Sequence, residues 1–228
     1  SIWWGPGYRG SMLFSNNAAP LDQIRIGSAE PFRLPWFLHY LGPIKITGLV
    51  GQLERDRDYP HTLVGAYRIS MAPSRFVEFG IGRAFQFAGK GRGYSLKDFP
   101  YTLYQSFLQG GGADHYDVSN LAKNINNLGS LDVTVRIPNV DRYIFIARDA
   151  SIYGEMGVDD SGPFFSHDEG SRTDKEGSIF FMRKPGGLIG TYLTGFLGDP
   201  KLDFRVEYTN TTSIMFTHGL YTDGFTHK

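Results

Sequence analysis

Cysteine is absent from the sequence, and so are two other features that define large classes of protein. Without cysteine there is no disulfide framework, no thiolate nucleophile and no cysteine-based zinc site. The 23 Lys and Arg residues balance 23 Asp and Glu residues, so the chain lacks the basic excess that neutralises phosphates. No stretch approaches the roughly 18 consecutive apolar residues of a transmembrane helix. A nucleic-acid partner is therefore not expected, and any membrane contact must be made by other elements.

Helical periodicity is also scarce, whereas alternation of apolar and polar residues is common. Residues 131–137 and 203–208 alternate cleanly, and 62–72 do so over a longer stretch. The 29 glycines and an aromatic content of 15% suit an all-β chain with many turns. Further strands are predicted at 44–55, 75–87, 142–148, 178–183, 188–197 and 212–217. Short helices are predicted only at 95–109, where Pro100 should interrupt the helix, and at 119–127.

The connections between these strands favour an outer-membrane barrel. Tight turns alternate with long polar loops, the longest at 88–129 and 159–177, and several strands have the 9–11 residues that a tilted membrane strand needs. A soluble β-sandwich gives the same alternation, so periodicity leaves both folds open. Arg83 is a misfit, because it shares a face with Val77, Phe79, Ile81 and Phe85 and would point to lipid unless a bulge shifts the register.

No arrangement of residues typical of catalysis is present. The six histidines show no metal-protease spacing, and there is no nucleophile elbow. The adjacent carboxylates Asp159–Asp160 and Asp168–Glu169 are more typical of solvated loops than of a glycosidase. Residues 89–93 lack phosphate-loop spacing and read as a flexible basic loop. We therefore predict no enzyme activity and no catalytic, cofactor-binding or metal-binding residues.

Two clusters are denser in functional side chains. Residues 3–11 contain adjacent tryptophans with Tyr8 and Arg9; they could stack on a sugar, but an aromatic belt at a membrane boundary is the favoured interpretation. Residues 52–59 carry charges of alternating sign, which indicate an ion-pair network in a lumen or at its rim, or else a solvated hairpin tip.

Several motifs resemble the capsule assembly Wzi family. They include Trp4-Gly5-Pro6-Gly7, Ser15-Asn16-Asn17-Ala18, Gly51-Gln52-Leu53-Glu54 with Arg57, and Gly82-Arg83-Ala84-Phe85. The match runs in order over most of the chain, and a later segment, 153–160, is similar as well. The residues that carry the resemblance are Trp3, Trp4, Asn16, Asn17, Gln52, Glu54, Arg55, Arg57 and Arg83.

The resemblance implies a transmembrane antiparallel β-barrel in the outer membrane of Gram-negative bacteria. It implies a non-enzymatic lectin that holds capsular polysaccharide or exopolysaccharide at the cell surface, in contact with outer-membrane lipid or lipopolysaccharide. Family members are about twice as long. Residues 1–228 would thus be a single barrel domain, the C-terminal portion of a longer protein.

Loop composition suggests which residues contact the polysaccharide, since aromatic rings stack on sugars and basic groups pair with acidic ones. The candidates are Tyr94, Lys97, Tyr101, Tyr104, His115 and Tyr116 in the first long loop and His167, Arg172 and Lys175 in the second. A porin or conduit is the alternative. Its lumen would be lined by Arg68, Glu78, Arg136, Arg205 and Glu207, unless these charges pair and block it.

Overall fold

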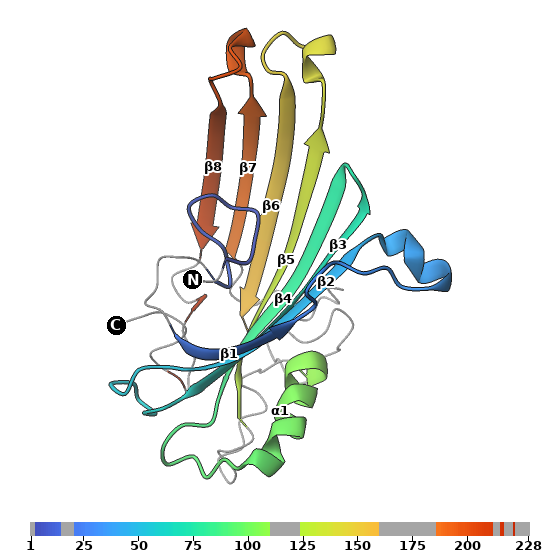
Figure 1. Cartoon of the computed structure of the whole chain (residues 1–228). Helices are drawn as coiled ribbons and strands as arrows, with labels where there is room; N and C mark the ends of the chain where they lie inside the picture. Colours follow the sequence, from blue (N-terminus) through green and yellow to red (C-terminus); the bar gives the residue numbers. More distant parts are fainter. Residues whose placement is uncertain are drawn as a thin grey trace, which may run out of the picture.

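In the computed structural model, the strands of the described residues form one antiparallel sheet of eight (Figure 1). The structure describes residues 3–14, 21–109, 124–159, 186–211, 215–216 and 221. The strands follow one another in chain order, so each pairs with its neighbours in the sequence. They are β1 (Asp22–Gly27), β2 (Ile44–Gln52), β3 (Leu63–Ser74), β4 (Val77–Phe87), β5 (Asn126–Ile137), β6 (Asp149–Asp159), β7 (Gly186–Thr194) and β8 (Phe204–Thr211).

The two ends of the sheet differ in their connections. The connections 28–43, 75–76, 138–148 and 195–203 lie at one end, which we call the turn end. They carry the short helices η1 (Trp36–Leu41), η6 (Val140–Arg142) and η7 (Phe196–Gly198). The two longest connections, 88–125 and 160–185, start from the opposite end, which we call the loop end. The asymmetry predicted from the sequence is therefore present.

The register separates the sheet into two chemically different faces. One row of paired residues runs through Ile46, Ile69, Ile81, Leu131 and Met156. Rows nearer the turn end on this face add residues such as Phe79, Val133, Ile152, Ile189 and Val206, so we call it the outer face. The alternate rows place Arg68, Asp132, Glu155, Arg136 and Arg205 on the inner face. This is the apolar-out, polar-in alternation of a barrel wall.

A helical segment covers the outer face at the loop end. It comprises η2 (Leu96–Asp98), α1 (Phe99–Tyr104) and a π-helical turn, η3 (Gln105–Gln109). Phe99 and Leu103 pack on a cluster built around Phe85 and Phe87. Pro100 lies in the first turn of α1 and does not interrupt it, because the amide that proline lacks has no partner within the helix at that position.

The same segment resolves the misfit of Arg83. No bulge changes the register there, and Arg83 stays on the outer face opposite Tyr67 and Gly129. Its guanidinium donates a hydrogen bond to the carbonyl oxygen of Ser106 in η3, which Tyr67 Oη also reaches at 3.2 Å. The predicted exposure to lipid is therefore wrong, because helical backbone covers the charge.

Other sequence expectations meet mixed outcomes. Strands are confirmed within 44–55, 62–72, 75–87, 131–137, 188–197 and 203–208, with shifted ends. Residues 142–148 form turns instead, and of 212–217 only the described residues 215–216 can be compared, which also form a turn. Residues 178–183 lie outside the described residues, and Asn126 starts β5 within the helix predicted at 119–127. No helix in the described part of the chain is long and apolar enough to cross a membrane.

Candidate functional site

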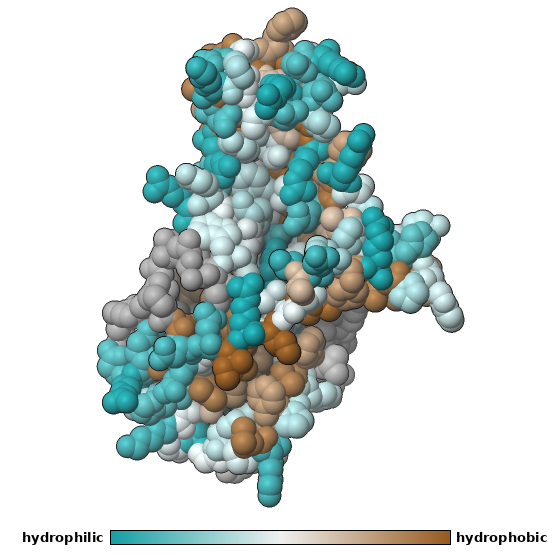
Figure 2. Space-filling view, viewed as in Figure 1, coloured by the Kyte–Doolittle hydropathy of each residue, from teal (hydrophilic) through white to brown (hydrophobic). Residues whose placement is uncertain are grey.

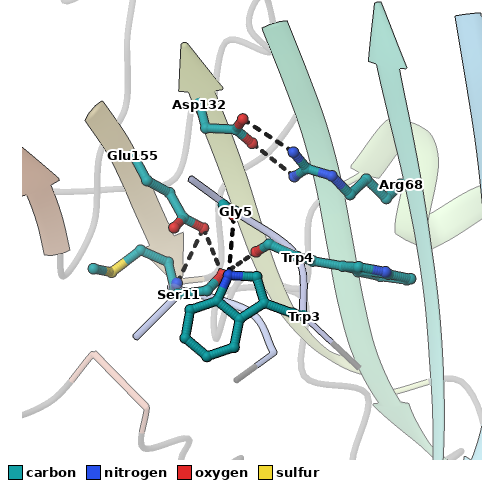
Figure 3. Close-up of polar contacts among 8 residues, drawn as sticks. Trp3, Trp4, Gly5, Ser11, Arg68, Asp132 and Glu155 are labelled. Atoms are coloured by element: carbon teal, nitrogen blue, oxygen red, sulfur yellow. Dashed lines mark hydrogen bonds and ion pairs between the residues drawn. The ribbon is translucent and has the colours of Figure 1, made fainter. Parts of the chain in front are cut away.

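A chain segment lies across the inner face of the sheet; we call this segment, residues 3–14, the strap (Figures 1 and 3). Trp4 is 5% exposed and packs on Leu49, Ala66 and Ala84, which point inward from β2, β3 and β4. Its ring meets Phe14 edge-on at 5.1 Å. The interpretation of the tryptophan pair as a membrane-boundary belt is wrong for Trp4, because the wall itself buries this ring.

Small residues in one row of the sheet make room for the strap. Gly82, Ser130, Gly157 and Gly186 pair in register across β4 to β7. A Cβ atom on Gly82 would lie 2.7 Å from Leu13, and one on Gly157 would lie 2.8 Å from Met12. A larger side chain at position 82 or 157 would therefore occupy space that the strap fills, whereas one at position 186 would collide with Met215.

Two inward-facing carboxylates hold the strap in place. Glu155 is 3% exposed, and its Oε1 accepts hydrogen bonds from Met12 N and Ser11 Oγ, both at 3.0 Å (Figure 3). Glu207 accepts from Tyr8 N at 2.6 Å and from Tyr153 Oη at 2.6 Å. Because a carboxylate binds backbone amides strongly, these contacts hold the strap against the inner face and also determine the course of its backbone.

Ion pairs cross the inner face beside the strap. Arg68 and Asp132 form a bidentate pair at 2.6 and 3.0 Å, and both side chains are largely buried (Figure 3). Arg136 and Glu78 pair at 2.7 Å in a more exposed position. The five charges proposed to line a pore are therefore on the inner face, and three of them are in ion pairs: Glu78 with Arg136, and Arg68 with Asp132.

Between the strap and these pairs lies a cavity of about 310 Å³. Arg205 and Tyr192 are in its wall, and the Arg205 guanidinium lies 4.2 Å from the ring centroid of Tyr192 and 4.4 Å from that of Tyr8. Charged groups of both signs, hydroxyls and tyrosine faces are the partners that a neutral, hydroxyl-rich ligand uses. The lining residues are Gly5, Pro6, Arg68, Glu78, Asp132, Thr134, Arg136, Ser151, Tyr153, Tyr192 and Arg205.

Three of the candidate loop residues lie on an exposed surface of the helical segment. Tyr101 and Tyr104 stack with ring centroids 6.2 Å apart, and 39% and 50% of their surfaces are exposed. Lys97 is exposed one turn earlier in η2, where Ser95 and Asp98 form a capping box. We call Lys97, Tyr101 and Tyr104 the tyrosine platform.

Tyr94 is placed differently from the platform. Its ring packs on Phe87 at 5.3 Å, and its hydroxyl lies 3.1 Å from Thr102 Oγ1. Burial raises the pKa of the Tyr94 hydroxyl above its ordinary value. The structure thus gives Tyr94 a packing role under α1.

The remaining predicted residues are scattered or lie outside the described part. Gln52 contacts His61, Glu54 pairs with Arg57 at 2.9 Å, and Arg55 is exposed, all around the β2–β3 connection. Trp3 Nε1 donates to the carbonyl of Gly5 at 3.1 Å. The residues Asn16, Asn17, His115, Tyr116, His167, Arg172 and Lys175 lie outside the described residues.

The basic loop 89–93, predicted from the sequence to be flexible, is anchored at Arg92. Arg92 is 3% exposed and lies over the rings of Tyr59 and Tyr221, at 5.2 and 4.5 Å. Its Nη2 donates to the carbonyl oxygen of Asn124 at 2.6 Å. Burial raises the pKa of the Tyr221 hydroxyl above its ordinary value. Arg92 therefore joins three distant segments of the chain.

Sequence reasoning named Glu207 only as a pore-lining charge, and it predicted neither the role of Glu155 and Glu207 in holding the strap nor the cavity beside them. The available signal was the inward phase of β6 and β8, where Glu155 and Glu207 alternate with outward apolar residues. The glycines opposite the strap were a second signal. Among the residues that the structure describes, no group of three or more His, Asp or Glu side chains is arranged to hold a metal ion.

Comparisons with known proteins agree with this architecture. The family described as capsule assembly protein Wzi matches residues 1–228. A Klebsiella pneumoniae protein, described as an uncharacterized 55.8 kDa protein in the cps region, is 27% identical over 162 residues, which are 70% of this chain and 29% of that protein. A solved structure is 20% identical with a TM-score of 0.56, and the match covers 98% of this chain and 42% of the other.

That solved structure is described as Wzi of Escherichia coli, an outer membrane protein involved in group 1 capsule assembly and a carbohydrate-binding β-barrel. The structural likeness shows a β-barrel fold for the present sheet, of which the described strands form one part of the wall. This chain spans less than half of the solved chain and under a third of the Klebsiella protein.

Proposed function

The chain belongs to the capsule assembly protein Wzi family, and from this premise we propose that it forms part of an outer-membrane β-barrel that binds surface polysaccharide and holds it at the cell. Binding is non-covalent and involves no catalysis. Many weak contacts to a repeating polymer add up to stable retention by multivalency. The E. coli relative described as a carbohydrate-binding barrel supports this proposal.

The outer face supports the membrane location. Ile24, Ile26 and Ile189 expose 82%, 78% and 60% of their surfaces on it, although large apolar side chains are usually buried in soluble proteins. Lipid chains satisfy such a surface, and we propose outer-membrane lipid, including lipopolysaccharide, as its partner. Figure 2 shows brown apolar side chains gathered over the region of β1.

The tyrosine platform is the observation that carries the polysaccharide proposal. It sits on a helical segment that covers the outer face at the loop end, and the buried polar contacts beneath it suit a position beyond the lipid chains. Two stacked, half-exposed rings next to a lysine form a surface on which a sugar ring can stack and an acidic group can pair.

Direct binding tests the proposal. The detergent-solubilised protein is titrated with the polysaccharide of its own host, and an unrelated outer-membrane barrel serves as the control. Selective, saturable binding is expected. The double variant Tyr101→Ala/Tyr104→Ala should weaken binding by at least about fivefold, since each ring contact contributes roughly 0.5–1.5 kcal/mol.

Tyr143→Ala is the matched variant, because Tyr143 is an exposed tyrosine at the turn end of the sheet. It should bind the polymer as the unmodified protein does. Binding no better than that of the unrelated barrel contradicts the lectin function. If both variants retain selective binding, the lectin function is kept but the tyrosine platform is not the binding site. The cavity beside the strap is then the next candidate.

A further inference from the structure

Two neighbouring turns expose large apolar side chains at the turn end of the sheet. The exposed fractions are 85% for Tyr143, 96% for Phe145 and 69% for Leu197. With Ile144, Ile146 and Leu202, which are also exposed, these residues form a group that we call the apolar rim. Figure 2 shows brown and tan side chains among teal ones at this end of the molecule. Single exposed apolar residues are ordinary, but six in two adjoining turns indicate an interaction surface.

The two turns of the rim are joined to each other and hold a defined conformation. Leu197 N donates to the carbonyl oxygen of Ile146 at 2.7 Å, which joins the β7–β8 connection to the β5–β6 connection. Leu197 has φ 55° and ψ 28°, the left-handed conformation that costs free energy for a non-glycine residue. Its side chain is exposed, so burial within the described residues offsets little of that cost. Strain of this kind at an exposed residue is typical of a functional position.

The rim continues the outer face of the barrel wall. Ile137 ends the outward row of β5 and Phe204 begins that of β8. The ring of Phe204 stacks on Phe196 at 4.9 Å, within the turn that carries Leu197. Whatever covers the outer face is therefore in a position to cover the rim.

The apolar strand surface is too short to cross a membrane without the rim. On β5 the uncovered outward residues run from 131 to 137, about 20 Å at roughly 3.4 Å per residue. A tilt of about 35–45° reduces this to roughly 15 Å, whereas the apolar band of outer-membrane barrels is about 25 Å tall. Towards the loop end, the helical segment over Arg83 closes the band. At the turn end, the rim adds to the height of the apolar band.

We propose that the apolar rim inserts among the phospholipid headgroups at the turn end and anchors the barrel at that boundary. Aromatic side chains favour this layer because the ring contacts acyl chains while polar groups stay hydrated. Arg142 and Lys201 lie in the same two turns and can extend to lipid phosphates. This inference rests on the proposed outer-membrane location.

A third connection at this end has the same composition. In η1, Trp36, Phe37 and Tyr40 expose 85%, 71% and 73% of their surfaces, and Trp36 has a left-handed φ of 59°. This separate connection thus also combines exposed aromatic residues with an apolar residue in a strained conformation. An interfacial anchor around the barrel requires such residues on several connections.

Site-directed spin labelling tests the anchor. The sequence contains no cysteine, so one introduced cysteine labels one position. The protein is reconstituted in vesicles of phosphatidylethanolamine and phosphatidylglycerol. Collisions of the nitroxide with oxygen, which concentrates in lipid, are then compared with collisions with a water-soluble nickel chelate. The variants are Phe145→Cys in the rim, Ile189→Cys on the outer face and Leu96→Cys at the loop end, where Leu96 is 90% exposed.

We expect oxygen to dominate at position 189, the nickel chelate to dominate at 96, and the ratio of oxygen to chelate collisions at 145 to lie between the other two, as in the headgroup layer. If the ratio at 145 equals that at 96 while oxygen dominates at 189, the anchor is wrong and the membrane location stands. If the chelate dominates at 189 too, the location itself fails. A label at 145 that is shielded from both reagents places protein over the rim and overturns the lipid assignment. All three side chains are exposed, so the substitutions should leave folding intact.

Discussion

At the scale of single residues, Gly5 decides whether the strap can lie against the inner face. Its φ of 145° is accessible to glycine and strained for other residues, and an added Cβ would lie 2.6 Å from Ser11 Oγ and closer still to Glu155. Gly5→Ala should therefore weaken the attachment of the strap by roughly 1–3 kcal/mol. Trypsin cleavage after Arg9, followed by mass spectrometry, should become at least about fivefold faster.

Gly10→Ala is the matched control for this substitution, because nothing lies within 4 Å of a Cβ atom at position 10. It changes the same strap in the same chemical way without a collision. Equal cleavage rates in the two variants would show that the close approach at Gly5 does not hold the strap.

The two inner-face ion pairs allow a second comparison at this scale. The side chains of Arg68 and Asp132 are 12% and 5% exposed, so Asp132→Asn leaves a buried arginine without its counter-charge and should destabilise the protein by about 3 kcal/mol. Glu78→Gln breaks the pair with Arg136, whose side chain is 48% exposed, and should cost under about 1 kcal/mol. Urea unfolding in detergent micelles measures both. Similar losses would mean that burial does not distinguish the pairs.

At the scale of elements, α1 owes its stability to packing. A helix of six residues is too short to be stable alone. The ring of Phe107 stacks on Tyr67 at 4.2 Å and ties the segment to β3. Phe107→Ala should thus increase hydrogen exchange several-fold in residues 99–107. Tyr104→Ala should not, although Tyr104 is as exposed as Phe107, because among the described residues its ring stacks on Tyr101 of the same helix. Equal protection in both variants would contradict this role of Phe107.

The elements also show what sequence patterns can and cannot predict. Strands such as β3 and β5 were predictable because one face is apolar and the other polar. Residues 142–148 are an apolar run between two arginines and were predicted as a strand, but they form turns, since Asn139 takes a left-handed conformation and starts η6. Their apolar side chains are exposed, and the pattern alone cannot show whether core or lipid covers such residues. The prediction that Arg83 faces lipid was wrong for a related reason, because the backbone that covers this residue belongs to η3, more than twenty residues later.

At the scale of the whole molecule, the site was less predictable than the wall. Family motifs marked Trp4 and Glu54, but the residues that place the strap meet only through long-range pairing: Ser11 with Glu155 and Tyr8 with Glu207. A search for catalytic or loop motifs cannot detect contacts between segments about 150–200 residues apart. The family resemblance supplied the fold and the functional expectation. The inner cavity could not be predicted, because its walls meet only in the folded chain.

The filled inner face leads to a prediction for the assembled barrel. The strap lies across the wall, and the charges that would line a conduit are largely paired, so the protein should conduct few ions in planar bilayers. Gly5→Ala, which loosens the strap, should increase the conductance, whereas Gly10→Ala should not. A steady open pore in the unmodified protein would favour the conduit function, because a pore needs unpaired lining groups and free volume. Silence in all three proteins would mean that other parts of the barrel close the lumen and that the strap is a structural brace.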